Sequence, residues 1–426
     1  MQPAGSSDHG PRPFAIVVWG ATGFTGRLVC EHLARDYQGK VKWAIAGRNE
    51  SKLQQVKQDM VAINPSCEDL AILVGDIQDE ASIGRIMQQT KVVVSTAGPF
   101  ASHGDAIVDQ ALAQGTHYCD ITGEIPWVRD SVVKRHEAAK ARGVKLVHCC
   151  GYDSIPSDLG VLMMVKHAKH KYSAGVSTVY NLVGDCSGSV SGGTIASGLL
   201  LTALPKEELH RLASDSYFLA SASGSPAGTD KPAPFKPVFV KEANAWTMPF
   251  LMSPVNSQIV HYSNALTGNS YGRDFHVLEA MSLGSGVPGF VKSCLGTGAM
   301  GVAAAVVFTK MLRPLVERII PAVGTGPSVK QMKTGYWKHD LVAYTEGPDP
   351  HMIRGHLEDL HRDPGYWGTS RMLLEAGLCL AQDSAQLSKS GYAGGGVLTP
   401  ASAMGTVLMR RLQAAGIKFQ ILEEDA

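Results

Sequence analysis

Short apolar runs alternate with amphipathic stretches near the start of the chain, and this alternation constrains the fold more than any other feature. Six runs rich in β-branched residues are separated by five stretches with helical periodicity. Strands that are apolar on both faces and joined by crossover helices require a parallel sheet covered on both sides. We therefore expect residues 14–150 to form a Rossmann-type, doubly wound α/β domain. The expected strands are residues 14–19, 41–46, 70–74, 92–96, 116–120 and 144–150, and the expected helices are 25–35, 51–64, 80–89, 104–113 and 127–141.

The βα rhythm stops after Gly151, which indicates a second domain. A proline-rich stretch at residues 225–237 interrupts the following region, and we expect residues 151–368 to form an α+β substrate domain. The pattern of residues 369–426 predicts helices that return to the first domain. Residues 1–13 contain no apolar run, so we expect a flexible leader and not a secretory signal. Helical periodicity returns over residues 300–320, 369–385 and 401–415.

Charge and cysteine usage narrow the class of protein. Lys and Arg total 39 against 38 Asp and Glu, so no overall field favours nucleic acid as a partner. The eight cysteines are scattered, without a C-x-x-C pair or zinc-ligand spacing. We expect an intracellular, cytoplasmic protein with reduced cysteines and no metal site.

Three glycines follow the first expected strand with the spacing G-x-x-G-x-x-G: Gly20, Gly23 and Gly26. This pattern alone is weak evidence, but here it lies between a strand and a helix, where a dinucleotide-binding turn belongs. Gly20 would allow the tight turn, Gly23 would let pyrophosphate approach the backbone, and Gly26 would let the helix pack closely on the sheet. Thr22 and Thr25 can add hydroxyl contacts. The alternative is an ordinary strand-to-helix turn.

The end of the second strand indicates which dinucleotide is bound. An NAD site usually has an acidic residue about 20 residues after the glycines, whereas this chain has Arg48, 22 residues after Gly26. A guanidinium can bind the 2′-phosphate of NADP in a bidentate manner. NADP is therefore the favoured cofactor, and NAD is the alternative. Arg48 could instead be a solvated loop arginine that contacts no cofactor. Asp76, after the third strand, could reach the adenine or could cap a turn.

A loop of mostly small residues follows the fourth strand and leaves room for a cofactor. It contains Thr96, Ala97, Gly98, Pro99 and Phe100. The complete set of expected cofactor contacts is Gly20, Thr22, Gly23, Phe24, Thr25, Gly26, Arg48, Asp76, Thr96, Ala97, Gly98, Pro99 and Phe100.

Substrates of open α/β sheets bind beyond the carboxyl ends of the strands. The fifth strand leads to Glu124, with Thr122 and Gly123 before it, and the sixth leads to Tyr152, Asp153 and Ser154. We expect Glu124, Tyr152, Asp153 and Ser154 to face the substrate. Tyr152 or Asp153 could donate a proton, although Asp153 could instead cap a helix, and the catalytic residues stay unassigned.

Several well-known catalytic motifs are absent from the sequence. No tyrosine is followed four residues later by lysine, which excludes the proton relay of short-chain dehydrogenases. The motifs G-x-S-x-G, H-E-x-x-H and G-x-x-x-x-G-K-[ST] are also absent, which argues against a nucleophile-elbow hydrolase, a zinc peptidase and a P-loop NTPase. A cofactor-dependent enzyme remains.

An apolar stretch at residues 293–309 has no charge over 17 residues and contains three glycines. It is slightly shorter than the roughly 20 residues that cross a bilayer. Its composition fits either a buried helix, which we favour, or a helix at a membrane surface.

Six strings of the sequence together resemble the saccharopine dehydrogenase-like oxidoreductases, a family that includes the trans-acting enoyl reductases. They are GATGFTGRLV, AIAGRNESKL, VVVSTAGPF, YCDITGE, CCGYDSIPSDLG and GGGVLTPASAMG. The resemblance implies a Rossmann domain joined to an α+β substrate domain and NAD(P)H chemistry. For some members it also implies lipid-related substrates and association with lipid droplets, membranes or organelles.

Two hypotheses follow for the function. The first is an NADP-dependent oxidoreductase that reduces an apolar, lipid-related carbonyl, imine or enoyl substrate by hydride transfer. The second is an NADP-binding sensor or lipid-surface scaffold without turnover. The expected partner is a small-molecule substrate. Contact with a membrane or lipid droplet is possible, and so is formation of a homodimer.

Overall fold

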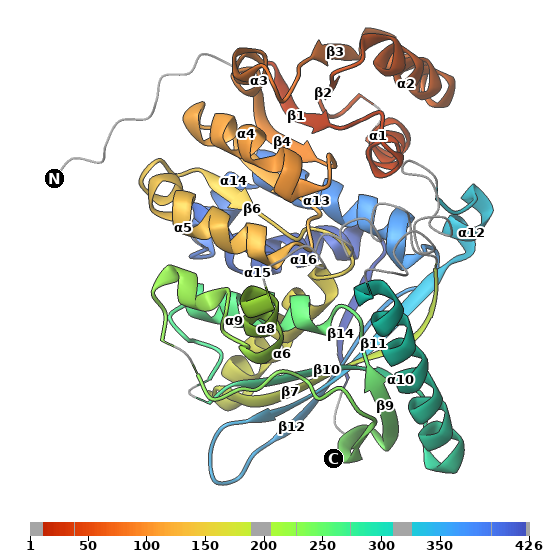
Figure 1. Cartoon of the computed structure of the whole chain (residues 1–426). Helices are drawn as coiled ribbons and strands as arrows, with labels where there is room; N and C mark the ends of the chain where they lie inside the picture. The colour runs from red at the N-terminus through yellow and green to blue at the C-terminus, as the bar shows by residue number, and fades with distance from the viewer. Residues whose placement is uncertain are drawn as a thin grey trace, which may run out of the picture.

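The computed structural model describes residues 12–37, 39–188, 206–226, 228–272, 274–309, 326–392 and 394–422. Two seven-stranded sheets form its framework (Figure 1). The first sheet is parallel throughout. Its strands are β1 (Phe14–Trp19), β2 (Trp43–Gly47), β3 (Ala71–Val74), β4 (Thr90–Ser95), β5 (His117–Asp120), β6 (Lys145–Val147) and β13 (Gly396–Leu398), arranged in the order β13-β6-β5-β4-β1-β2-β3.

Helices cover both faces of the first sheet because its strands are apolar on both faces. In β1, Ile16 and Val18 join one buried cluster, whereas Val17 and Trp19 join another. The first cluster includes α1 (Phe24–Asp36), α2 (Glu50–Ile63), α13 (Thr369–Gln382) and α16 (Gly405–Ala414). The second includes α3 (Glu80–Met87), α4 (Phe100–Ala113) and α5 (Ile125–Ala141).

The second sheet is mixed, with β10 parallel to β7 and the other neighbours antiparallel. Its strands are β7 (Val176–Ser187), β8 (Val238–Val240), β9 (Ala245–Pro249), β10 (His276–Ser282), β11 (Tyr336–Thr345), β12 (Met352–Asp359) and β14 (Lys418–Leu422), in the order β14-β12-β11-β7-β10-β9-β8. The remaining helices are α6 (Ile155–Tyr172), α8 (Lys206–Ser214), α9 (Ser253–Leu266), α10 (Gly286–Phe308), α12 (Val329–Thr334), α14 (Ser384–Lys389) and α15 (Pro400–Ala403).

Helix α6 connects the two parts of the molecule. It packs against β7, β11 and β12 of the second sheet and against α9, α15 and α16. Short helical turns complete the described structure: three of 3-10 type at Pro65–Asp69, Ala220–Ser223 and Lys241–Ala243, and one of π type at Pro364–Gly368.

The structure confirms the expected fold class, a doubly wound parallel sheet with a second α+β unit. Two features differ from the expectation. The sequence gives six strands for the first sheet, but Gly396–Leu398 adds a seventh by pairing with β6. The region 369–426 was expected to return as helices to the first domain, and α13 does pack on β1, β4 and β5. However, Lys418–Leu422 pairs with β12 of the second sheet.

The expectation of a buried helix in the stretch 293–309 is wrong. Helix α10 begins earlier, at Gly286, and extends along the surface of the second unit (Figure 1). Only 6% of its most apolar window is buried inside the protein. By length and composition it is the one described helix that could span a membrane. Residues 310–325, residues 189–205 and residues 1–11 of the expected leader lie outside the described residues.

Candidate active site

A cavity of about 690 Å³ lies at the carboxyl ends of the strands of the first sheet. The strand order reverses between β1 and β4, and ligands of doubly wound sheets bind at such a switch point. The cavity is lined by 15 of the 17 predicted site residues, the exceptions being Gly26 and Tyr152. These 15 residues are Gly20, Thr22, Gly23, Phe24, Thr25, Arg48, Asp76, Thr96, Ala97, Gly98, Pro99, Phe100, Glu124, Asp153 and Ser154.

The glycine turn has the geometry that the sequence predicts. Gly20 has a φ of +82°, which side chains disfavour. A Cβ at Gly26 would lie 2.3 Å from the carbonyl oxygen of Gly20 and 2.8 Å from Oγ1 of Thr96. Gly26 therefore lies behind the cavity wall, where it permits contact between α1 and the strand ends.

Helix α1 presents an uncapped N-terminus to the cavity. Its N-cap, Gly23, has no side chain to satisfy the first amides, and the first turn contains no acidic residue. Free amides and the positive end of the helix dipole attract phosphate. Phe24 in this turn packs edge-on against Tyr366, with ring centroids 5.1 Å apart. The turn is thus held in place, and Gly23, Phe24 and Thr25 at the start of the helix line the cavity, as a pyrophosphate site requires.

Arg48 and Asp76 lie at the part of the cavity beyond β2 and β3. Arg48 is exposed, and it is the one Arg or Lys among the described residues that line the cavity. Asp76 accepts a hydrogen bond at 3.0 Å from the backbone amide of Gln78, so it caps a turn, which was the alternative to contact with the adenine. It also lines the cavity. A guanidinium at the end of β2 fits the 2′-phosphate of NADP.

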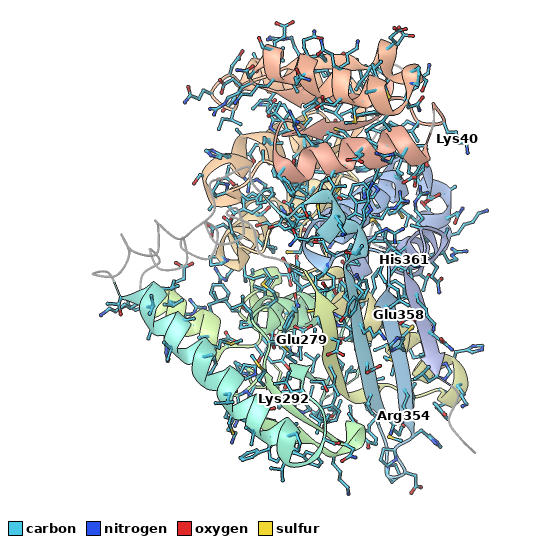
Figure 2. The ribbon with its side chains drawn as sticks, turned by 90° about the vertical axis from the view of Figure 1, so that its right-hand side faces the viewer. Lys40, Glu279, Lys292, Arg354, Glu358 and His361 are labelled. Carbon is cyan, nitrogen blue, oxygen red and sulfur yellow. The ribbon has the colours of Figure 1, made fainter. Side chains whose placement is uncertain are left out.

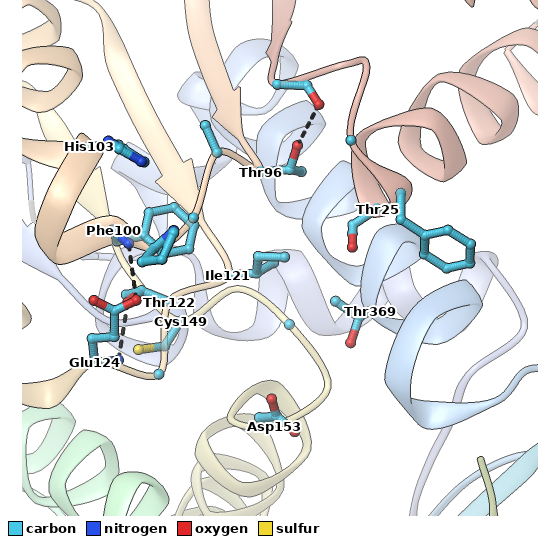
Figure 3. A pocket seen from close by; sticks show the side chains of 18 of the residues that line it. Thr25, Thr96, Phe100, His103, Ile121, Thr122, Glu124, Cys149, Asp153 and Thr369 are labelled. Atoms are coloured by element: carbon cyan, nitrogen blue, oxygen red, sulfur yellow. Dashed lines mark hydrogen bonds between the residues drawn. The ribbon is translucent and has the colours of Figure 1, made fainter. Parts of the chain in front are cut away.

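The loop after β4 is fixed by Glu124 (Figure 3). The carboxylate of Glu124 accepts hydrogen bonds from the backbone amides of Phe100 at 3.0 Å and Ala101 at 2.8 Å. These amides begin α4, whose own N-cap, Pro99, offers no side-chain acceptor. Glu124 was expected to face the substrate. It lines the cavity, and its hydrogen bonds make it a positioning residue for the loop.

A buried hydrogen-bond network supports the loops after β5 and β6. Asp120 accepts hydrogen bonds from the amides of Thr122 at 3.1 Å and Cys149 at 3.2 Å, and its other oxygen is 2.7 Å from Nδ1 of His148. The second ring nitrogen of His148 is 3.0 Å from Oγ of Ser131. In the described part of the chain, no cluster of three His, Cys, Asp or Glu residues could hold a metal. His148 is a structural residue of this network.

Three consecutive residues before α6 point in different directions. Tyr152 does not reach the cavity, contrary to the expectation, because its hydroxyl lies 3.0 Å from Nε2 of His339 and its ring packs on Trp337. Ser154 lines the cavity and donates a hydrogen bond at 3.0 Å to Oδ1 of Asn256. Asp153 faces the cavity (Figure 3). Burial of Tyr152 raises its pKa well above 10, which removes it as a proton donor to the cavity.

The sequence did not reveal a further part of the cavity wall. It comes from α8, the start of α9 and the start of α13, which are distant in sequence. Cys149 is buried and also borders the cavity, with a φ of 63° that is uncommon for a residue with a side chain. The additional lining residues include His103, Ile121, Cys149, Leu212, Leu251, Met252, Pro254, Val255, Tyr366 and Thr369.

The fold and the cavity define a two-part, dinucleotide-binding oxidoreductase. Residues 16–147 match the family model described as the saccharopine dehydrogenase NADP binding domain, which identifies the cofactor as NADP. A Mycobacterium tuberculosis protein provisionally named a trans-acting enoyl reductase is 38% identical over 422 residues, covering 96% of this chain and 98% of that protein. The trans-acting enoyl reductase of Mycobacterium leprae is 33% identical over 419 residues, covering 95% and 97%.

The chain therefore belongs to the saccharopine dehydrogenase-like oxidoreductases, the family that includes the trans-acting enoyl reductases. The solved structure of saccharopine dehydrogenase (L-Glu forming) from Saccharomyces cerevisiae has the same fold. That match has a TM-score of 0.53 at 12% identity and covers 96% of this chain and 99% of the other. The protein is accordingly an NADP-dependent oxidoreductase.

Proposed function

We propose that the protein reduces an apolar, lipid-related substrate in which a carbon–carbon double bond is conjugated to a thioester carbonyl. The observation that carries this proposal is the composition of the cavity wall. The part of the wall that comes from α8 and from the start of α9 consists mainly of apolar side chains: Leu212, Leu251, Met252, Pro254 and Val255. The relatives named enoyl reductases favour an enoyl group over the carbonyl and imine alternatives.

The charges of the cavity argue against a substrate with several carboxylates. Such a substrate needs Arg or Lys partners, whereas Arg48 is the one such residue among the described lining residues and lies on the cofactor side. Saccharopine-like substrates are therefore disfavoured. An acyl chain, in contrast, gains about 0.8 kcal/mol for each methylene group that is buried.

When bound, NADPH supplies the hydride. The residues of this chain bind and orient the reactants: the amides of the Gly20–Gly26 turn bind pyrophosphate, Arg48 binds the 2′-phosphate, and Glu124 fixes the loop of Thr96–Phe100. A bound acyl chain would cover the apolar wall and displace water from it, which would strengthen electrostatic interactions near the reacting carbons.

Oxidation of NADPH tests this proposal directly. Crotonyl and octenoyl thioesters of N-acetylcysteamine are offered with NADPH, and the saturated product is identified by mass spectrometry. We expect the octenoyl probe to be reduced faster, because its chain reaches the apolar wall. Acetoacetyl thioester serves as the carbonyl comparison. A scaffold without turnover, the second hypothesis, would bind NADPH but oxidise it with none of these acceptors.

We also propose that α10 rests on a lipid surface. Its outward residues include Val287, Leu295 and Val302, with exposed fractions of 75%, 70% and 66%. Lys292 is the one charged residue in the helix, and no acid is present (Figure 2). In sequence, Lys310 and Arg313 follow the helix. An exposed apolar face combined with basic residues suits the interface of an anionic lipid layer.

A further inference from the structure

The short loop before α6 holds Asp153 toward the cavity. The preceding residue, Tyr152, is anchored by its hydroxyl at His339 and by its amide, which donates to Oγ1 of Thr369 at 3.1 Å. The following residue, Ser154, is anchored at 3.0 Å to Asn256. Because both neighbours are fixed to other elements, the intervening side chain has a defined direction. Figure 3 shows Asp153 pointing from this loop into the cavity.

The anchor of Ser154 is itself supported. Nδ2 of Asn256 donates to Oε2 of Glu279 at 2.9 Å, and the other oxygen of Glu279 accepts from Nδ2 of Asn181 at 2.8 Å. Asn181 in turn lies 3.1 Å from the ring of His339, which binds Tyr152. The two anchors of the loop therefore belong to one buried hydrogen-bond network, and this network fixes the loop from both sides.

Other groups at the cavity are less suited to give a proton to a substrate. Glu124 already accepts two amide hydrogen bonds. The thiol of Cys149 has its pKa raised well above 9 by burial, so it holds its proton too strongly. Arg48 is a permanently charged guanidinium that lies beyond β2, on the cofactor side of the cavity, and His103 lies on α4. Among the described residues, no hydrogen bond engages the carboxyl group of Asp153, which is exposed to the cavity.

The electrostatic surroundings of Asp153 favour the protonated acid. Desolvation by the cavity walls raises its pKa from 3.8 to about 6. A general acid is most effective when its pKa lies near the working pH. The titratable groups on the elements that form this part of the cavity are Cys149 after β6, Glu124 before α5, His103 from α4 and Tyr366 before α13. Glu279 from β10 belongs to the network that anchors the loop, and Arg48 lies on the cofactor side of the cavity, beyond β2.

We propose that Asp153 is the catalytic acid that protonates the α-carbon of the enoyl thioester. This inference rests on the proposed function. The hydride of NADPH forms the new C–H bond at the β-carbon, and the electron pair of the double bond moves toward the α-carbon and the thioester carbonyl. The carboxylic acid of Asp153 then gives its proton to the α-carbon and becomes a carboxylate. NADP⁺ and the saturated thioester leave, and a solvent proton restores the acid.

The test compares wild type, Asp153→Asn and Asp153→Glu with NADPH and the octenoyl thioester of N-acetylcysteamine. Asp153→Asn should lower kcat by at least about a hundredfold, the lower range for a general acid, while NADPH affinity and circular dichroism stay unchanged. Asp153→Glu keeps an acid and should recover part of the activity. In wild type, kcat/KM should fall as pH rises above about 6, because Asp153 loses its proton. Asp130→Asn, on the exposed part of α5, is the matched control.

The possible results separate the two proposals. If wild type reduces the probe and Asp153→Asn stays within threefold of it, the role of Asp153 is refuted while the proposed function stands. If Tyr366→Phe or His103→Asn loses activity instead, the proton comes from that residue and the assignment to Asp153 is wrong. If wild type binds NADPH but reduces no enoyl probe, the proposed function fails, and the role of Asp153 fails with it.

Discussion

Glu124 caps the helix that begins at Phe100, although the two residues are 24 positions apart in the chain. Its oxygens accept hydrogen bonds from the amides of Phe100 and Ala101, and thereby fix the loop after β4 that lines the cavity. Glu124→Gln should lower the stability by about 2 kcal/mol, the range of hydrogen bonds to charged groups, and weaken NADPH binding. Thermal denaturation and NADPH fluorescence measure both effects. Glu137→Gln is the control, because its side chain on α5 is 83% exposed, and it should change neither the stability nor NADPH binding. If Glu124→Gln behaves like Glu137→Gln in both measurements, the capping role of Glu124 is refuted.

Arg48 is expected to determine the choice between NADPH and NADH. Replacing it by Asp places a carboxylate near the 2′-phosphate, and like charges about 4 Å apart cost about 4 kcal/mol at an effective dielectric constant near 20. Arg48→Asp should therefore shift the ratio of the two dissociation constants toward NADH by more than about tenfold. Isothermal titration with each nucleotide measures this ratio. Arg27→Ala, on α1 outside the cavity, is the control, and an unchanged ratio in Arg48→Asp would contradict the assignment.

Glu279 should make the stability depend on pH. Burial raises its pKa from 4.5 to about 7, so the folded protein keeps a proton that the unfolded chain has lost over this interval. The stabilising contribution is complete below pH 4.5 and declines as pH rises to about 7. Denaturant unfolding of wild type and Glu279→Gln between pH 5 and pH 8 tests this. As pH rises, the free energy of unfolding of wild type should decrease relative to that of Glu279→Gln. If the difference between the two free energies of unfolding is constant with pH, Glu279 does not titrate between pH 5 and pH 8.

The apolar face of α10 should carry the contact with lipid. Leu295→Asp and Val302→Asp place charges on this face, so they should reduce co-sedimentation with phosphatidylcholine–phosphatidylserine vesicles by at least about tenfold. Val133→Asp, at an apolar side chain 62% exposed on α5, should bind like wild type. Suppose that wild type does not co-sediment with the vesicles but forms a dimer, and that these two substitutions dissociate the dimer. The apolar face then binds a second copy of the chain, and the lipid proposal is wrong.

Local patterns were sufficient to predict the first part of the fold. Hydrophobic periodicity located the strands and helices up to residue 150, and the steric demands of a phosphate-binding turn explained Gly20 and Gly26. The start of α4 was placed four residues late, at Gly104 instead of Phe100, because its cap comes from Glu124, which no local pattern connects to it.

Features that depend on distant contacts were not accessible from the sequence. The direction of the Tyr152 side chain is set by His339 and Trp337 on β11. Its place after the sixth strand, beside Asp153 and Ser154, therefore led to the wrong expectation that it faces the substrate. The run of three residues that forms β13 is too short for periodicity to identify it as a strand, and only pairing with β6 makes it one. The apolar composition of α10 suggested burial, since composition alone does not distinguish a buried helix from an exposed helix.

Titration of NADPH against wild type and Gly26→Ala tests whether the turn from Gly20 to Gly26 holds the dinucleotide. An added Cβ at Gly26 would lie 2.3 Å from the carbonyl oxygen of Gly20, so the turn must move. Gly298→Ala, where nothing lies within 4 Å, is the matched control. Wild type and Gly298→Ala should bind NADPH, whereas Gly26→Ala, still folded by circular dichroism, should bind it at least about tenfold more weakly. Folded wild-type protein that binds neither NADPH nor NADH, or equal affinity in all three proteins, would contradict this expectation.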